Sequence, residues 1–423
     1  MSFIMLINRW ISILFVICYT YQILYLLVAL LHRPVLPLVS RHHRYAVLIA
    51  ARNEQAVIAL LIESIRQQTY PCHLVEIYVI ADNCSDQTAE VARKAGAQVI
   101  ERFNKQFVGK GYALQMLFSE VLQRTQGHPY DGYFVFDADN LLDSNYIEAM
   151  NRVFAAGHPI ITSYRNSKNY TSNWISAGYS LWFLRESRYL NQARMLLGIS
   201  CCISGTGFLI DHQTVMEHNG WKHFLLTEDL EFTVDVILAG KRIAYCPDAI
   251  LYDEQPVTWS QSWTQRLRWT KGYMQVFAAY GSSLLGCLFK RCRLACLDII
   301  LTIMPAFVLS AIVLSINLAA ILIGLVSQHN ISALLSQTVA GLLIVYLSLY
   351  AVGLITTLSE WRWILGSPLK KIWATVTFPI FMLTYIPIAL TSLFKKVVWQ
   401  PTPHTCAVTL SQIKAIKDKA SGA

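Results

Sequence analysis

The sequence predicts an α/β domain with an open, mainly parallel sheet, joined to membrane-spanning helices. Two observations predict the membrane part. Of the 423 residues, 54% are hydrophobic, and no charged residue interrupts Ile11–Leu31, a run long enough to cross a bilayer. A third observation predicts the sheet, because strand-like and helix-like segments alternate in the stretch of roughly 250 residues after that run.

Further apolar runs near the C-terminus complete the predicted membrane part. The candidate spans are Ile11–Leu31, Ile299–Val326, Ala333–Leu358 and Ile372–Phe394. A signal peptide is the alternative for the first, but that run is too long and no small-residue cleavage site comes after it. Basic residues gather on one side of the spans, at His32, Arg33, Arg41, Arg44, Lys290, Arg291 and Arg293. The positive-inside rule then places the large domain in the cytoplasm and the N-terminus outside. We expect an integral protein of the plasma membrane.

Charge and cysteine content narrow the partners. The net charge of +9 is explained by basic residues that face anionic membrane lipid. No basic run is combined with aromatic residues in a nucleic-acid pattern, so we expect no nucleic-acid partner. The ten cysteines show no zinc-ligand spacing, and in a cytoplasmic domain they are expected to be free thiols. The oligomeric state is left open.

The predicted sheet comes from the first half of the large domain. Its strands are "YAVLIAA" (45–51), "VEIYVIAD" (75–82), "AQVIER" (97–102) and "YFVFDAD" (133–139), and helices are predicted over 53–68, 85–96 and 109–124. Asp82, Asp137 and Asp139 fall at strand ends. In open α/β sheets, ligands bind beyond the carboxyl ends of the strands, so we expect a site there.

Asp137 and Asp139 are candidate metal ligands. Two carboxylates one residue apart repel each other unless a cation lies beside them, and Mg²⁺ or Mn²⁺ prefers such oxygen ligands. A solvated turn, with Asn140 capping the next segment of the chain, is the alternative.

Asp82 and Lys110 are candidates for binding a nucleotide. Asp82 could accept hydrogen bonds from a nucleoside, or cap the next helix. Lys110 lies between two glycines at a helix start, where a diphosphate would be favoured, although a solvated loop lysine is the alternative.

Two later motifs supply further candidates. In "TEDLEF" (227–232), Glu228 and Asp229 precede a helix-like segment that runs to Gly240, and one of them could be a general base. A helix capping box is the alternative. In "QRLRW" (265–269), Gln265 and Arg268 share one helix face and could bind a phosphate, unless the segment is only an interfacial amphipathic helix.

The order of these motifs resembles that of the processive family 2 glycosyltransferases, which include cellulose, chitin, hyaluronan and poly-N-acetylglucosamine synthases. An Asp after the second strand is succeeded by Asp-x-Asp, Thr-Glu-Asp and Gln-x-x-Arg-Trp, and then by membrane spans. The resemblance extends from "AARNE" (50–54) to "WQPTPHT" (399–405). It implies a GT-A nucleotide-sugar domain, which is Rossmann-like, on a transmembrane bundle with interfacial helices.

The resemblance also implies a role for each matching residue. The donor nucleotide would be bound by Arg52, Glu54, Asp82, Lys110, Gln265, Arg268, Thr402 and His404. Asp139, with Asp137, would hold Mg²⁺ or Mn²⁺. Asp229, beside Glu228, would take the proton from the acceptor hydroxyl. The acceptor would meet Trp269 and the "SGTGFLI" segment, at Gly205, Thr206 and Gly207.

These assignments divide the chain into five segments. They are an N-terminal membrane helix (1–33), the cytoplasmic glycosyltransferase domain (34–257), interfacial helices (258–296), C-terminal membrane helices (297–396) and a tail with the "WQPTPHT" motif (397–423). Spanning by all the apolar runs would leave the tail outside, away from a cytoplasmic nucleotide. Because the last run contains Pro379 and Pro387 and has lysines at both ends, we expect it to be interfacial or re-entrant.

The leading functional hypothesis is an inverting transferase that uses UDP-glucose or UDP-N-acetylglucosamine to elongate and translocate a β-linked extracellular polysaccharide. A single transfer to a lipid acceptor, yielding a glycolipid, is the alternative within the same chemistry. A transporter or lipid-binding membrane protein without catalysis is the alternative from another class. The near absence of acids in the spans disfavours that last hypothesis.

Overall fold

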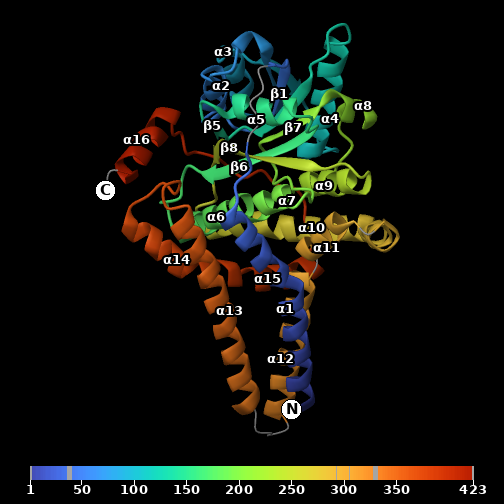
Figure 1. The fold of residues 1–423 in the computed structure, drawn as a ribbon, viewed down its shortest axis with the longest axis vertical. Coiled ribbons are helices and arrows are strands. Elements are labelled where there is room, and N and C mark those ends of the chain that lie inside the picture. The colour runs from blue at the N-terminus through green and yellow to red at the C-terminus, as the bar shows by residue number, and fades with distance from the viewer. Residues whose placement is uncertain (1, 36–40, 292, 304, 327–331, 422–423) are drawn as a thin grey trace.

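The computed structural model describes residues 2–35, 41–291, 293–303, 305–326 and 332–421, drawn in Figure 1. The strands are β1 (Tyr45–Ala51), β2 (Val75–Asp82), β3 (Gln98–Arg102), β4 (Gly132–Asp137), β5 (Leu141–Leu142), β6 (Ile160–Ser167), β7 (Phe208–Asp211) and β8 (Ile243–Asp253). The helices of the sheet domain are α2 (Ile58–Arg66), η1 (Cys72–Leu74), α3 (Thr88–Lys94), α4 (Lys110–Arg124), α5 (Tyr146–Ala155), α6 (Trp174–Arg185), η2 (Glu186–Asn191), α7 (Gln192–Leu196), α8 (His212–Glu217) and α9 (Glu228–Leu238). The remaining helices are α1 (Ser2–Leu31), α10 (Trp259–Arg291), α11 (Leu294–Ile303), α12 (Pro305–Val326), α13 (Ser332–Ser359), α14 (Pro368–Leu383), α15 (Tyr385–Phe394) and α16 (Leu410–Ser421).

One mixed sheet organises the upper part of the molecule, with strand order β3-β2-β1-β4-β7-β6-β8-β5. The strands from β3 to β4 are parallel, whereas β7 runs antiparallel to both β4 and β6. The sequence therefore predicted the parallel half correctly, and the sheet as a whole is mixed. The change of direction at β4 and β7 brings the end of β4 next to the segment that enters β7.

Alternation along β1 shows how the sheet is buried on both faces. Val47 and Ile49 pack in a core with residues of α2 and α5, while Ala46 and Leu48 pack in a second core with residues of α4 and α6. All of these β1 side chains are fully buried. Burial on both faces explains why β1 is a continuous apolar run.

The predicted strands 45–51 and 75–82 agree with β1 and β2, but the helices after them begin later than predicted. Helix α2 begins at Ile58 instead of residue 53, and α3 begins at Thr88 instead of residue 85. Asn53 and Asn83 have positive φ, which asparagine tolerates. This conformation lies outside the right-handed helical region, so neither residue can belong to the helix that comes after it. The Glu54 amide donates to Thr88 Oγ1 at 2.8 Å, so these polar residues build a loop at the carboxyl edge of the sheet.

Long apolar helices extend away from the sheet domain. Figure 1 shows α1, α12 and α13 running downward from it, while α14 and α15 lie near the junction and α15 runs crosswise to the long helices. By length and composition, Leu6–Leu31, Leu335–Ser359 and Pro368–Phe394 could each cross a membrane. The last of these is divided at Thr384 into α14 and α15, and 39% of its most apolar 18-residue stretch is buried inside the protein. Residue 304, within the predicted span Ile299–Val326, lies outside the described residues.

Candidate active site

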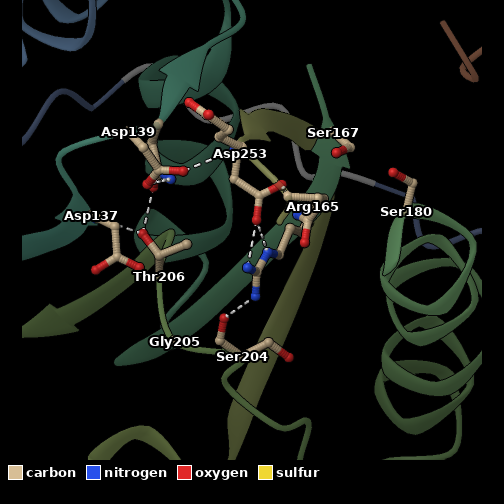
Figure 2. Close-up of polar contacts among 12 residues, drawn as sticks. Asp137, Asp139, Arg165, Ser167, Ser180, Ser204, Gly205, Thr206 and Asp253 are labelled. Carbon is tan, nitrogen blue, oxygen red and sulfur yellow. Dashed lines mark hydrogen bonds and ion pairs between the residues drawn. The ribbon is translucent and has the colours of Figure 1, made fainter. Parts of the chain in front are cut away.

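Asp137 and Asp139 lie at the carboxyl end of β4, in a segment (137–140) that we call the acid turn. The strand was predicted to reach residue 139, but it ends at Asp137, and Asp139 belongs to the turn after it. Figure 2 shows the two side chains close to Thr206. Thr206 Oγ1 accepts from the Asp137 amide at 2.8 Å and donates to Asn140 Oδ1 at 2.5 Å. The turn is therefore held from the β7 side of the sheet.

Asp139 is buried and surrounded by cationic groups. Its Oδ2 accepts from the Glu254 amide at 2.8 Å, and its Oδ1 accepts from the Asn140 side chain at 3.2 Å. Burial alone would raise the pKa of Asp139, but His404, Lys168 and the Glu254 amide outweigh it and hold that pKa below its usual value. This carboxylate is therefore ionised at neutral pH.

Lys110, the first residue of α4, lies directly on Asp137. Its ammonium pairs with Asp137 Oδ1 and donates to the Gly205 carbonyl at 2.6 Å. Burial would lower the pKa of Lys110, but Asp137, Glu228 and Asp229 outweigh it and raise that pKa. The solvated-loop alternative is wrong for this lysine, since its side chain is only 12% exposed.

The acids at the start of α9 lie across Gly205 from Asp137. An added Cβ on Gly205 would be 4.0 Å from Asp137 Oδ2 and 4.0 Å from Asp229 Oδ2. Burial raises the pKa of Glu228 to about 7, with Asp229 adding to the rise and Lys110 opposing it. Burial also raises the pKa of Asp229. Thr227 makes no side-chain capping bond, so the capping box that was the alternative for this motif is not formed.

The motif "QRLRW" lies on α10, and its two arginines face different surroundings. Arg268 is partly exposed and close enough to Glu228 and Asp229 to lower the pKa of both. Arg266 is fully buried and donates to the Phe381 carbonyl at 3.2 Å and to Thr384 Oγ1 at 2.6 Å. Arg266 therefore fastens α10 to α14 and α15, and only Arg268 faces the acids.

Trp269, the residue after Arg268, packs against aromatic side chains of α6. Its ring makes edge contacts with Tyr179 and Phe183 at centroid distances of 5.7 and 6.0 Å. Both of those rings belong to α6, and Phe381 of α14 packs in the same cluster. Trp269 therefore belongs to an aromatic cluster that joins α10 to α6 and α14.

The segment Gly205–Gly207 connects these groups, as Figure 2 shows in part. Gly205 and Gly207 both have positive φ. A Cβ on Gly207 would come within 2.0 Å of Leu251 Cδ2, so β8 approaches this position too closely for any side chain. Gly205 faces the acids, while Gly207 and the hydroxyl of Thr206 have structural partners.

Residues of the first two loops form the other end of the site. Asp82 forms a buried ion pair with Arg102 at 2.5 Å, and burial nevertheless raises the pKa of Asp82. Arg52 lies over the ring of Trp399, with 5.3 Å between the guanidinium carbon and the ring centroid. Burial raises the pKa of Glu54 to about 7, and its Oε1 is 2.8 Å from His404 Nδ1.

The "WQPTPHT" segment lies against this end of the site. Burial would lower the pKa of His404, but Asp139, Glu54 and Glu254 outweigh it and raise that pKa to about 10. The carboxylate of Glu254 accepts from the amides of Thr405 and Cys406 at distances of 2.8 to 3.1 Å. Thr402 is partly buried in the same segment. His404, Thr405 and Cys406 therefore bring the tail into contact with the sheet domain.

Several buried polar atoms at the site have no hydrogen-bond partner among the described residues: Arg52 Nη1, Glu54 Oε2, Gln265 Oε1 and Trp399 Nε1. Unpaired buried groups are costly, so they indicate a polar ligand. The acid turn fits Mg²⁺ or Mn²⁺, because these ions bind through one or two carboxylates together with substrate phosphates. Asp137 is 35% exposed at its side chain and reachable.

Sequence reasoning missed three residues that hold the site. The Glu254 amide donates a hydrogen bond to Asp139, and the Glu254 carboxylate accepts one from the Cys406 amide of the tail. Arg102 forms an ion pair with Asp82. Arg165 pairs with Asp253 at 2.5 Å and donates to the Ser204 carbonyl at 2.7 Å, as seen in Figure 2. The sequence did indicate such residues in one way, because it places charged residues inside predicted or apolar strands. A charged side chain is rarely buried in a strand unless it is paired with another group.

Comparisons with known proteins show which family and relatives this chain is similar to. A family described as "Glycosyltransferase like family 2" matches residues 42–272. A probable glycosyltransferase, YdaM, of Bacillus subtilis is 28% identical over 55% of this chain and 56% of its own length. A β-monoglucosyldiacylglycerol synthase of Trichormus variabilis is 30% identical, covering 56% of this chain and 50% of its own. A poly-β-1,6-N-acetyl-D-glucosamine synthase of Staphylococcus aureus is 26% identical over 54% of each chain. The chain thus spans about half the length of these relatives.

A solved structure shares the fold over nearly the whole chain. The mannosyltransferase PcManGT of Pyrobaculum calidifontis, in complex with GDP-mannose and Mn²⁺, has a TM-score of 0.58 at 15% identity. The match covers 92% of this chain and 99% of that one. At this identity the likeness shows the fold alone, and it confirms the predicted GT-A class.

Proposed function

Because the chain belongs to the glycosyltransferase family 2, we propose that it transfers a hexose from a UDP-sugar to an acceptor held at the membrane surface. One observation carries the proposal. Lys110, Asp137 and Asp229 meet around Gly205, so a cation that could bind phosphate, an acid that could bind a metal ion and a candidate base share one small space. An inverting transfer needs such a base opposite the leaving group.

The donor would lie along the carboxyl edge of the sheet. Arg52, Glu54 and Asp82 would contact the nucleoside, and Lys110 and Arg268 the diphosphate. The divalent ion, bound by Asp139 and Asp137, would neutralise charge on the departing nucleotide. The tail, fastened by His404 and Glu254, would cover the nucleotide and exclude water.

Asp229 would remove the proton from the acceptor hydroxyl. Its position beside Gly205 leaves backbone room for a sugar, and Trp269 offers an aromatic surface on the membrane side. The raised pKa of Glu228 would let it keep a proton near pH 7 and leave the negative charge on Asp229. This division of roles would avoid two adjacent buried carboxylates.

For the acceptor, we favour a growing β-linked polysaccharide that is elongated and passed across the membrane. The Gln-x-x-Arg-Trp set beside the candidate base supports this choice. A glycolipid product is the second candidate, supported by the relatives named β-monoglucosyldiacylglycerol synthase. Size analysis of the product decides between them, because elongation gives a ladder and single transfer gives one glycolipid.

The membrane arrangement is constrained by the contacts of the tail. His404, Thr405 and Cys406 touch Glu54 and Glu254, so the tail and the sheet domain lie on the same side. Crossings by α1, α12 and α13, with α14 and α15 interfacial, satisfy this requirement. We therefore propose that the catalytic domain and the tail are both cytoplasmic.

Two substitutions test the assignment of roles. Asp229→Asn preserves shape and removes the base, so kcat should fall about 10²- to 10⁴-fold with little change in UDP affinity. Arg268→Ala should instead weaken UDP binding, by loss of a charge-assisted phosphate contact. Near-normal turnover in a folded Asp229→Asn protein, measured by radiolabelled sugar transfer, would contradict the proposal that Asp229 is the general base. Full activity in the presence of EDTA would contradict the assignment of a divalent metal ion to Asp137 and Asp139.

A further inference from the structure

A second cluster of ligand-type side chains lies outside the candidate active site. His218 comes directly after α8, His223 lies in the loop before α9, and Asp235 lies within α9. Figure 1 shows α8 and α9 at the same edge of the sheet domain. One ligand atom from each residue lies within 4.8 Å of the other two. Among the described residues, this is the group of histidines and acids whose spacing suits a metal ion.

The distances fit a tetrahedral ion. His218 Nε2 is 3.5 Å from Asp235 Oδ2, and His223 Nε2 is 3.2 Å from the same oxygen. With metal–ligand bonds of about 2.0–2.1 Å, the edge of a tetrahedron is about 3.3 Å. Each ring nitrogen is therefore already separated from the carboxylate oxygen as two ligands of one ion would be, and all three ligand atoms lie within 4.8 Å of one another.

The chemistry of the cluster differs from that of the acid turn. Imidazole nitrogens favour Zn²⁺ and related transition metals, whereas carboxylates with phosphates favour Mg²⁺ or Mn²⁺. His223 is 1% exposed, and its Nδ1 has no partner among the described residues, so the ring is engaged through Nε2, at the cluster.

We propose that His218, His223 and Asp235 bind a Zn²⁺ ion, with a water molecule at the fourth position. Lys222 Nζ lies 3.0 Å from Asp235 Oδ2 and stands where the ion's charge would be. Its side chain is 49% exposed and flexible enough to turn outward when the ion binds. The aromatic rings of Trp221 and Phe232 pack against His223 and hold it in place.

The ion would fix the segment that carries the proposed base. Helix α9 begins at Glu228 and Asp229, and Asp235 lies further along the same helix. The His223 carbonyl packs against Gly111, where an added Cβ would be 2.2 Å away, and Gly111 is the residue after Lys110. A metal joining His218 and His223 to α9 would therefore fix the position of α9 relative to the start of α4.

Metal binding to the purified full chain tests the proposal. After chelation and desalting, the protein should retain one equivalent of added Zn²⁺, and Zn²⁺ should raise its Tm. Co²⁺ should give the visible absorption of a tetrahedral complex. His218→Gln and Asp235→Asn should abolish the retained ion, the Tm rise and the absorption, whereas His128→Asn, at an exposed histidine, should keep all three.

Lys222→Gln distinguishes a metal site from an ion pair alone. If Lys222 competes with the ion, its removal should tighten Zn²⁺ binding and enlarge the Tm rise. If the cluster is only a salt bridge, Lys222→Gln should lower Tm equally with and without Zn²⁺. That result, or a wild-type protein that retains no stoichiometric Zn²⁺, would overturn the proposal, whatever the transferase activity.

Discussion

Substitution of Gly207 by alanine should destabilise the sheet domain more than the same substitution at Gly205. Both glycines have positive φ, so alanine carries a backbone penalty of about 1–2 kcal/mol at either position. Only Gly207 adds a steric penalty, because its Cβ would meet Leu251 at 2.0 Å and Ser163 Oγ at 2.6 Å. Overpacking of a well-packed core costs about 1–3 kcal/mol.

The difference between the two variants isolates the steric effect. Since 1 kcal/mol corresponds to about 2–4 °C for a domain of this size, Gly207→Ala should melt lower than Gly205→Ala by several degrees. Tryptophan fluorescence of the detergent-solubilised protein on heating measures both midpoints. Equal midpoints would refute the inferred close approach of β8 to the loop. An unfolded Gly205→Ala would refute the inference that this position has room.

Three further predictions concern the tail, the membrane-side anchor and the topology. The pKa of His404 is raised to about 10 from an ordinary 6.5, so its stabilisation of the tail is complete below pH 6.5 and lost as pH rises through 10. Proteolysis of the tail in metal-free buffer should therefore increase over that window, and His404→Gln should be cleaved readily already at pH 6. Arg266→Gln should lower the unfolding midpoint by removing buried charge-assisted bonds to α14 and α15, each worth about 1.5–3 kcal/mol, whereas Arg268→Ala should melt normally. A single cysteine at Lys414, in a cysteine-free background, should resist an impermeant thiol reagent in intact cells, and ready labelling would place the tail outside.

The parallel half of the fold could be predicted from local patterns. Strands β1 and β2 are short apolar runs bounded by turn residues, and their ends agree with the structure to the residue. Strands β6, β7 and β8 were not predicted. Their partners are distant in the chain, and Phe208–Asp211 is too short to be recognised by periodicity. The antiparallel insertion of β7 depends on long-range pairing that one sequence does not encode locally.

The site could be predicted where residue type and order carried the chemistry. Lys110, Asp137 and Asp229 do meet, as their positions at strand and helix ends suggested. The supporting pairs could not be predicted, because Glu254 and Arg102 act through geometry and belong to no motif. The structural partners of Thr206 were missed for the same reason, since a hydroxyl within a glycine loop gives no indication of which side it faces.

Glu254 also has a consequence for how the protein folds. Its amide contact to Asp139 spans 115 residues of chain, and its carboxylate contacts with the tail span 151 and 152. Contacts that close such long loops bear a large entropic cost and form late, after local helices and hairpins. A nascent chain that has completed only the sheet would hold the acid turn without its cover. The candidate site can thus be completed only after the tail has been synthesised and has reached Glu254.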